Sequence, residues 1–253
     1  MTTPEFETYL VKLLDHDSFA AADPSRNGLQ IANSGKQVRR AAFAVDACLE
    51  TIERAAAAQA DILCVHHGLF WKDPEPVTGM HYRRIKTAFD ADLALFASHL
   101  PLDAHGELGN NIGLLRRLEL QEPQPFGEWR GACIGWRGMS PQALDLDTVI
   151  RRLFPDGKTV PHVLPFGPRA IRSIGIISGG AGHEADQAVS AGCDLFITGE
   201  IGHELYHYAR EQGLSVLAAG HYQTETIGVQ LLAAHVGRET GVDTLFIDVP
   251  TGL

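Results

Sequence analysis

The sequence predicts an α/β protein made of two related halves with mixed, largely parallel sheets and a small inserted α+β subdomain. Short apolar runs alternate with segments of helical periodicity, which is the pattern of βαβ units. Two of the runs also recur at one offset of 133 positions (171 − 38 and 194 − 61): residues 38–45 match residues 171–178, and residues 61–65 match residues 194–198. The repeat indicates that the two halves share one plan.

The first half is expected at residues 1–120 and the second at residues 169–253. Between them, residues 121–168 become rich in Pro, Gly and Trp, and we expect this stretch to form the small α+β subdomain. A third pair of apolar runs, 93–97 and 214–218, supports the division, although the second run follows a shorter connection.

The individual elements follow from the spacing of apolar residues. Strands are expected for short buried runs, and helices for apolar residues three or four positions apart. The expected strands are residues 38–45, 61–65, 93–97, 131–136, 171–178, 194–198 and 214–218, and the expected helices are residues 6–14, 49–59, 80–89, 146–154, 227–236 and the last part of 107–120. Asp23-Pro24 breaks the chain, and Asn27-Gly28 is a turn signal.

Composition narrows the class of protein. The chain has 253 residues, and its 31 Asp and Glu against 21 Lys and Arg give a net charge of −10, which argues against a general nucleic-acid-binding surface. Its four cysteines show no CxxC spacing, which indicates free thiols in a reducing compartment. The N-terminus lacks a signal-peptide core, and no run of about 18 apolar residues could span a membrane. We expect a soluble cytoplasmic protein with no membrane partner.

Two adjacent histidines, His66 and His67, follow an apolar run where its strand should end, and Gly68 then allows a sharp turn. In an open α/β sheet, ligands bind beyond the carboxyl ends of the strands. Neutral imidazole is also a common metal ligand. The two histidines are therefore candidate metal ligands, although the same pair would also suit a solvated loop.

Two further strand ends carry the same kinds of side chain. The loop after the run 93–97 contains His99 and Asp103, and the last expected strand leads to His221 and Glu225, which are spaced for one face of a helix. Histidines mixed with carboxylates suit Zn, Mn or Fe better than Ca or Mg, which prefer oxygen ligands. A carboxylate among histidines could bridge two ions about 3.5–4 Å apart. The alternative is a set of unrelated polar residues at loop mouths.

Five motifs together resemble one family. They are NGLQ at residues 27–30, VHHG at 65–68, SHLPLDAHGELGNN at 98–111, TGE at 198–200 and GHYQTE at 220–225. In content and order they are similar to the Nif-three-like (NGG-interacting factor three) proteins, which are GTP cyclohydrolase I type 2 homologs. VHHG combined with the late GHYQTE is the specific part of the resemblance, because NGLQ alone would be weak.

The resemblance implies two α/β halves around a dinuclear metal centre, assembled as a toroidal homohexamer. The ligands that it implies for two divalent ions are His66, His67, Asp103, His221 and Glu225. Glu225 would bridge the ions, His99 would support the ligands or transfer protons, and Asn110 would shape its loop. The resemblance leaves the identity of the ions open among Zn, Mn and Fe. Many relatives carry a longer insert than residues 121–168.

Two other patterns compete with this assignment. His203–His207 (HELYH) matches the HExxH zinc motif, but it is expected on a helix between two strands, so a solvated or cavity-facing helix is favoured. Residues 180–185 fit GxGxxA, and Glu200 lies about 20 positions further on, where a dinucleotide-binding protein would place its ribose-binding acid. That fingerprint is short, and loop shaping or phosphate binding is the favoured interpretation.

The sequence therefore predicts a dinuclear-metal-dependent hydrolase acting on a small molecule, which could be a nucleotide. The family label implies opening of the purine ring of GTP with loss of formate, and the same site would suit a phosphoester or an amide. No sequence motif indicates recognition of the guanine base. A base could stack on the aromatic rings of Trp129, Trp136 and Phe126, but such residues more commonly pack in a core or an interface. The alternative function is a non-enzymatic, metal-binding assembly or regulatory protein.

Overall fold

The computed structural model describes residues 1–73 and 75–253, which divide into two compact units. Unit 1 contains Met1–Leu102 and Gly228–Val249, and unit 2 contains Asp103–Ile227 and Pro250–Leu253. The chain passes from unit 1 to unit 2 within helix α4 (Leu100–Ala104) and returns within helix α9 (His221–Thr240). Three of the predicted metal ligands, Asp103, His221 and Glu225, lie on these two helices.

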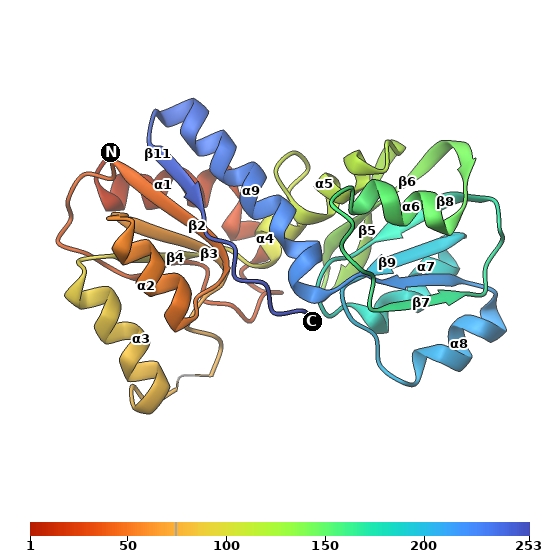
Figure 1. Ribbon diagram of the computed structural model, residues 1–253, viewed down its shortest axis with the longest axis horizontal. Helices are drawn as coiled ribbons and strands as arrows, with labels where there is room; N and C mark the ends of the chain where they lie inside the picture. The colour runs from red at the N-terminus through yellow and green to blue at the C-terminus, as the bar shows by residue number, and fades with distance from the viewer. Residues whose placement is uncertain (74) are drawn as a thin grey trace. The chain divides into compact units, whose positions relative to one another are not determined.

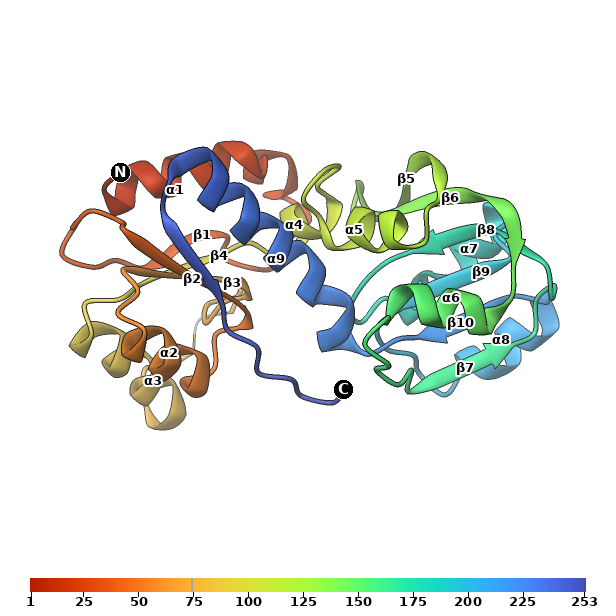
Figure 2. The ribbon, with the colours of Figure 1, turned by 45° about the horizontal axis from the view of Figure 1, so that its top comes forward.

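The sheet of unit 1 has five strands in the order β1-β4-β3-β2-β11. They are β1 (Gly28–Ile31), β2 (Arg40–Asp46), β3 (Ile62–His67), β4 (Ala94–Ala97) and β11 (Asp243–Phe246). All neighbours in this sheet are parallel except β1, which is antiparallel to β4. Figures 1 and 2 show α2 (Leu49–Ala57) and α3 (Gly79–Asp90) on one face, with α1 (Thr3–Leu13) and the end of α9 on the other. A short 3-10 helix, η1 (His16–Phe19), follows α1.

Because helices cover both faces, the central strands of unit 1 have long apolar stretches. Residues 41–45 of β2 and 62–65 of β3 are all buried, as expected for parallel strands packed on both sides. Helix α2 begins where Cys48 Sγ accepts the backbone N–H of Thr51 at 3.4 Å, while the Thr51 hydroxyl accepts the N–H of Cys48 at 3.0 Å. This reciprocal pair satisfies N–H groups that the start of a helix leaves without partners.

The sheet of unit 2 has six strands in the order β5-β6-β8-β9-β10-β7. They are β5 (Gln121–Trp129), β6 (Ala132–Leu144), β7 (His162–Pro165), β8 (Ile171–Ile176), β9 (Leu195–Thr198) and β10 (Ser215–Ala218). Strands β8, β9 and β10 are parallel, and β6 and β7 flank them in antiparallel orientation. The helices of unit 2 are α5 (Asn110–Arg117), α6 (Leu146–Leu153), α7 (Ala185–Ser190) and α8 (Leu205–Gln212), with a 3-10 turn, η2 (Gly182–Glu184).

The predicted α/β class with mixed sheets is confirmed, while the borders of its parts differ from those expected. Residues 121–168 supply β5, β6, α6 and β7, so they extend the second sheet instead of standing apart from it. The chain after Ile227 returns to unit 1, because β11 pairs with β2. Strand β5 lacks an apolar pattern because it is an edge strand, and an edge tolerates its two prolines, Pro123 and Pro125.

One hydrogen-bond pattern recurs in both units at the offset of 133 residues. The carboxylate of Asp61 accepts the N–H groups of residues 39 and 40 at 2.8 and 3.0 Å. The carboxylate of Asp194 accepts the N–H groups of residues 172 and 173 at 2.8 and 2.9 Å. Each aspartate precedes one parallel strand (β3 or β9) and braces its neighbour (β2 or β8). The two units are therefore related in backbone hydrogen bonding as well as in sequence.

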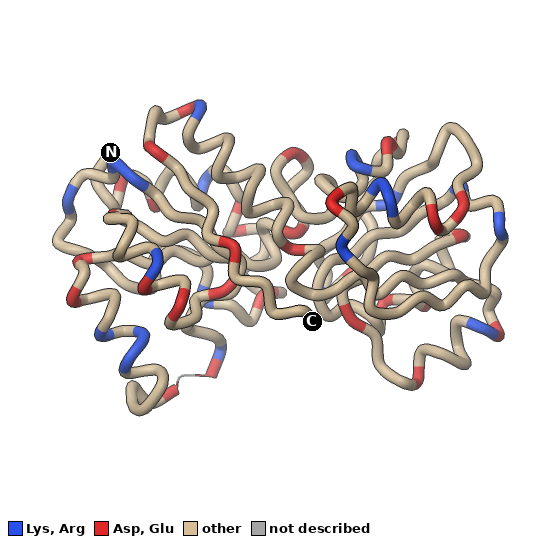
Figure 3. Tube along the Cα trace, viewed as in Figure 1, with Lys and Arg blue, Asp and Glu red and all other residues tan. Residues whose placement is uncertain are grey.

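Charged residues of both signs are spread over the two units, as Figure 3 shows. Two of the arginines cap helix ends: Arg152 Nη1 donates to the carbonyl of Leu118 at 2.9 Å, and Arg117 Nη1 donates to that of Leu153 at 3.0 Å. Helices α5 and α6 thus stabilise each other's C-terminal carbonyls.

In the part of the chain that the structure describes, no helix is long and apolar enough to cross a membrane. The four cysteines are free thiols.

Candidate metal centre

Three histidines gather at the carboxyl ends of two neighbouring strands in unit 1. His66 and His67 are the last residues of β3, and His99 lies two residues after the end of β4. Because β3 and β4 are parallel and adjacent, their carboxyl ends lie side by side. Each of the three rings offers a nitrogen within 4.8 Å of those of the other two. The structure therefore groups His99 with the predicted ligands His66 and His67.

Each of these rings is oriented by an oxygen acceptor at Nδ1. The pairs are His66 Nδ1 with the carbonyl of Ser98 at 3.0 Å, His67 Nδ1 with Asp46 Oδ1 at 2.9 Å, and His99 Nδ1 with Asp23 Oδ1 at 2.9 Å. Because the oxygens accept, a neutral ring carries its proton on Nδ1 and its lone pair on Nε2. Metal-binding histidines are commonly held in this way. In the neutral form, all three rings thus carry the lone pair on Nε2, the atom that can bind a cation or accept a proton.

Another buried histidine, His16, shares Ser98 with His66 as a hydrogen-bond partner. The hydroxyl of Ser98 lies 3.0 Å from His16 Nε2, and the His16 ring stacks on Phe96 with centroids 5.5 Å apart. Burial lowers the pKa of His16 to about 4, against the opposing effect of nearby aspartates. His16 is therefore neutral at pH 7, and it adds no positive charge next to the partner that orients the candidate ligand His66.

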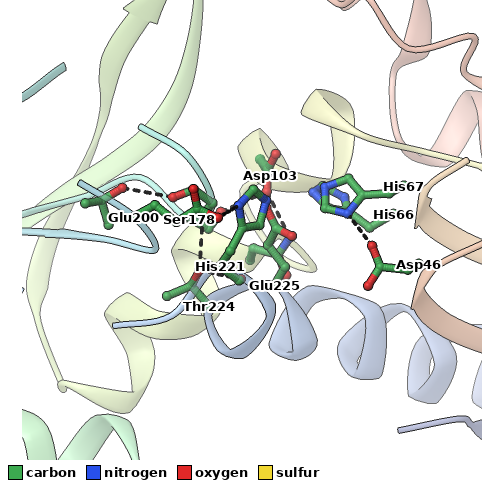
Figure 4. Close-up of polar contacts among 12 residues, drawn as sticks. Asp46, His66, His67, Asp103, Ser178, Glu200, His221, Thr224 and Glu225 are labelled. Carbon is green, nitrogen blue, oxygen red and sulfur yellow. Dashed lines mark hydrogen bonds and ion pairs between the residues drawn. The ribbon is translucent and has the colours of Figure 1, made fainter. Parts of the chain in front are cut away.

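Unit 2 brings together Asp103, His221 and Glu225, whose side chains Figure 4 shows near one another. Asp103 lies on α4, while His221 and Glu225 occupy successive turns at the start of α9. His221 Nε2 lies 3.2 Å from Glu225 Oε1, and carboxylate oxygens of Asp103 and Glu225 approach within 4.8 Å. Both carboxylates are buried, with 6% of Asp103 and 2% of Glu225 exposed. This group therefore combines one imidazole with two buried acids.

Polar neighbours hold Asp103 in place. Its Oδ1 accepts hydrogen bonds from Asn110 Nδ2 and the hydroxyl of Ser178, each at 2.9 Å. The side chain of Asn111 accepts the backbone N–H of Ser178 at 2.7 Å and donates to the carbonyl of Ile134 at 2.8 Å. These bonds tie the loop after β8 to the start of α5, so the Asp103 carboxylate is fixed by two separate elements.

His221 is held between two carboxylates. Its Nδ1 lies 2.6 Å from Glu200 Oε1, in the loop after β9, and its Nε2 faces Glu225. Burial would lower the pKa of His221, but the hydrogen bonds and negative charges of Glu225 and Glu200 outweigh it and raise the pKa to about 9. Without a metal ion, the ring is therefore protonated at neutral pH. A cation that binds Nε2 displaces that proton.

Glycines leave the space that His221 and Glu225 occupy. Gly179 has φ +67°, and a Cβ built there would lie 2.4 Å from Glu225 Oε1 and 3.2 Å from His221 Nε2. At Gly199, a Cβ would lie 2.7 Å from the Cα of His221. The N–H of Gly179 also donates to the hydroxyl of Thr224 at 3.1 Å. Glycine meets both demands at position 179, the left-handed backbone and the close approach.

The types of donor suit a transition-metal ion. Unit 1 has three imidazole nitrogens within 4.8 Å of one another, and in unit 2 Glu225 lies near the His221 imidazole and the Asp103 carboxylate, which are donor types that suit Zn, Mn or Fe. Two buried carboxylates close together repel each other when both are ionised, and a divalent cation would offset that repulsion. Mg and Ca, which prefer oxygen ligands alone, fit these groups less well.

Several residues that hydrogen-bond to His99 or to the candidate ligands were not predicted in that role from the sequence. Asp46 ends β2 beside His67, so the same strand-end rule would have found it. Asp23 lies in a loop distant in sequence and showed only a turn signal. Glu200 and Asn110 were considered for other roles, as a ribose-binding acid and a loop-shaping residue. The structure shows their side chains hydrogen-bonded to His221 and Asp103 respectively.

The HELYH pattern lies away from the candidate ligands, whereas the nucleotide pattern overlaps them. His203 and His207 are exposed, and among the described residues the groups close enough to share a metal ion include neither of them. Glu200, the acid of the nucleotide pattern, is engaged with His221. The segment after the pattern's first glycine forms a 3-10 turn and a helix of 6 residues. Trp136, one of the aromatic residues considered for base stacking, donates a hydrogen bond from Nε1 to the carbonyl of Ala104 at 2.9 Å.

The fold and its donor groups define an α/β protein with candidate transition-metal ligands at the ends of parallel strands. The chain belongs to the Duf34/NIF3 (NGG1p interacting factor 3) family, whose model matches residues 1–252. The family predicted from the five sequence motifs is thereby confirmed.

Relatives and solved structures agree with this membership. A Treponema pallidum protein named GTP cyclohydrolase 1 type 2 homolog is 45% identical, with 100% of each chain covered. A Deinococcus radiodurans protein of the same name is 44% identical over 92% of this chain and 89% of its own. The crystal structure of TTHA1606 from Thermus thermophilus is 39% identical, with a TM-score of 0.92 over 100% of both chains. HcgD from Methanocaldococcus jannaschii, 22% identical with a TM-score of 0.84 over 98% of both chains, shares the fold.

Proposed function

We propose that this protein is a hydrolase that depends on two divalent metal ions. The observation that carries the proposal is the histidine group of unit 1. His66, His67 and His99 each have Nδ1 held by an oxygen, and their ring nitrogens lie within 4.8 Å of one another. This orientation of neutral imidazoles is typical of metal ligands.

The five proposed ligands come from the family resemblance of the motifs. They are His66, His67, Asp103, His221 and Glu225, with Glu225 as the bridge between the ions. The buried carboxylates of Asp103 and Glu225 support the assignment, because they supply negative charge that a cation would neutralise. Zn, Mn and Fe remain the candidate ions, since the donors mix nitrogen with oxygen.

Bound divalent ions would polarise a substrate oxygen and favour deprotonation of water, which is the chemistry that hydrolysis needs. The residues of the chain then have separate tasks. Asp46 and Glu200 hold His67 and His221 in orientation. His99, with its Nδ1 proton held by Asp23, has a lone pair on Nε2 that can accept a proton and return it to a leaving group.

The substrate class follows from the chemistry and from the names of the relatives. Those names, GTP cyclohydrolase 1 type 2 homolog, favour ring opening of a purine nucleotide. Hydrolysis of a phosphoester or an amide would use the same donors. A screen of nucleotides, phosphoesters and amides with the metal-loaded protein is therefore the first assay.

The first prediction concerns metal content and turnover. Elemental analysis of the reconstituted protein is expected to give about two transition-metal ions per chain, and chelation should remove hydrolysis. His203→Ala is the matched control, and it should keep both the ions and the activity because His203 is exposed and outside both donor groups. At most one ion in every reconstitution would contradict the bridged pair. Two ions with no turnover in the screen would favour the non-enzymatic, metal-binding function.

The second prediction separates the bridging residue from the proton carrier. Glu225→Gln keeps the volume and removes the charge, so it is expected to weaken both ions and abolish hydrolysis. His99→Ala is expected to slow turnover while both ions stay bound, with affinity reduced by no more than about 10–100-fold. Metal stoichiometry and turnover are measured for both variants, with circular dichroism as the folding control. If Glu225→Gln retained two ions and normal activity, the role given to Glu225 would be wrong.

A further inference from the structure

The NGLQ motif has no role in the proposed chemistry, yet its segment contacts the loops that follow β3 and β4 in unit 1. The segment, Asp23–Gln30, runs from just after η1 into β1. We propose that the Asp23–Gln30 segment is a positioning element that fixes the His99 side chain and the loop that directly follows His66 and His67. The inference rests on the proposed metal centre for its purpose, but its geometry lies entirely within unit 1.

At one end of the segment, Gln30 holds the loop that follows His67. Its Oε1 accepts the N–H of Leu69 at 2.7 Å and that of Phe70 at 3.1 Å. Its Nε2 donates to the carbonyl of Phe70 at 3.2 Å and to that of Arg26 at 2.8 Å. One amide therefore fastens the backbone directly after the histidine pair to the segment itself.

Gly68 makes this contact sterically allowed. A Cβ at position 68 would lie 2.4 Å from both the oxygen and the nitrogen of the Gln30 amide. The glycine of VHHG therefore packs directly against the side-chain amide of the glutamine of NGLQ. A side chain at position 68 would push the amide away and break its four hydrogen bonds.

At the other end, Asp23 and Asn27 hold His99. The Asp23 side chain is 0% exposed. Its Oδ1 accepts from Ser25 N and pairs with His99 Nδ1, both at 2.9 Å, and its Oδ2 accepts from Leu100 N at 2.9 Å and Asn27 Nδ2 at 2.7 Å. Asn27 Oδ1 in turn accepts the backbone N–H of His99 at 2.9 Å. Both the ring and the backbone of His99 are thus fixed by the segment.

The middle of the segment contacts the loop after β3 through its backbone. Arg26 N–H donates to the carbonyl of Phe70 at 3.0 Å, and Ser25 forms a β-bridge with Trp71. The Trp71 ring packs edge-on to His99, with centroids 5.1 Å apart. The segment therefore joins the loops after β3 and β4 through side chains and backbone together. Partners behind metal-binding histidines set ring direction and tautomer, and their loss typically weakens metal binding by about 10–100-fold.

The experiment compares two variants of the segment with a matched control. Asp23→Asn leaves one acceptor oxygen for four donors, and Gln30→Met removes the amide that holds the loop after His67. Asp61→Asn is the control, because Asp61 also accepts two backbone N–H groups but precedes β3, at the end opposite His66 and His67. Long-range 1H–15N NMR of metal-free protein reports the His99 tautomer, and competition with a chelator reports zinc affinity.

The expected result is a wild-type His99 that carries its proton on Nδ1 and loses this preference in Asp23→Asn. Zinc affinity is expected to fall by about 10–100-fold in Asp23→Asn and Gln30→Met, while Asp61→Asn lowers the melting temperature but leaves both readouts unchanged. A wild-type His99 protonated on Nε2 would overturn the inference, as would an equal loss of affinity in Asp61→Asn. If Asp23→Asn does not fold, the positioning role is tested by the His99 tautomer in the wild-type spectrum and by the zinc affinity of Gln30→Met. If wild-type protein binds no metal at all, the proposed function fails, while the tautomer still tests the positioning role.

Discussion

At the residue scale, the candidate histidines differ from ordinary surface histidines because each has a fixed partner. Asp46, Asp23 and Glu200 face the Nδ1 atoms of His67, His99 and His221. Sequence spacing predicted the histidines, since strand ends can be recognised from apolar runs. It could not predict Asp23, because the loop that carries it reaches His99 only through tertiary packing over 76 positions.

A third prediction concerns the charge of His221. Folding raises its pKa to about 9, so the folded, metal-free protein binds this proton more tightly than the unfolded chain does. The resulting stabilisation is complete below about pH 6.5, the unfolded value, and is lost as the pH rises through about 9. Chemical unfolding of metal-free protein from pH 6 to 10 should show this loss, and His221→Gln should remove it.

Metal binding should show the opposite trend, because a cation competes with that proton. Zinc affinity is expected to rise by about tenfold per pH unit from pH 6.5 towards 9. His203→Ala is the control and should follow the wild type in both measurements. Stability and affinity that changed together in the same direction would contradict the role given to His221.

At the element scale, the parallel strands were the most predictable part of the chain. The runs that became β2, β3 and β4 are almost purely apolar, and so are those of β8, β9 and β10. Strands β1, β7 and β11 are short and only partly buried, and β5 contains prolines, so local pattern did not reveal them. Pairing partners that are distant in sequence decide such strands, as β11 with β2 illustrates.

The loop after β8 leads to a fourth prediction. Gly179 and Gly192 both have φ +67°, but a Cβ at position 192 would meet nothing within 4 Å, whereas one at 179 would collide with Glu225. Both alanine variants should lose about 1–2 kcal/mol of stability from the left-handed backbone. Only Gly179→Ala should also weaken zinc binding, because it displaces the Glu225 carboxylate. Equal zinc affinity in the two variants would show that Gly179 does not shape the donor group.

At the scale of the whole molecule, the family and its fold could be predicted because several motifs occur in order over nearly the full chain. The borders of the units could not, since α4 and α9 each run from one unit into the other without a break in composition. A linker rich in Pro or Gly would have marked such a border.

The fifth prediction is a closed homohexamer, which rests on the family resemblance. Helix α3 exposes the large apolar side chains of Met80, Tyr82 and Phe89, a feature that contact with another copy would cover. Light scattering at micromolar concentration is expected to give six times the chain mass of 27.4 kDa. A monomer under those conditions would contradict the assembly.

The repeated aspartate brace carries a consequence for ancestry. Asp61 and Asp194 make the same pair of hydrogen bonds at one offset, which is the pattern that duplication of a single ancestral segment would leave. At that offset, His66 and His67 correspond to Gly199 and Glu200. The first unit therefore has two histidines where the second has a glycine that makes room for His221 and an acid that pairs with it. The framework recurs in both units, while the side chains at the strand ends differ.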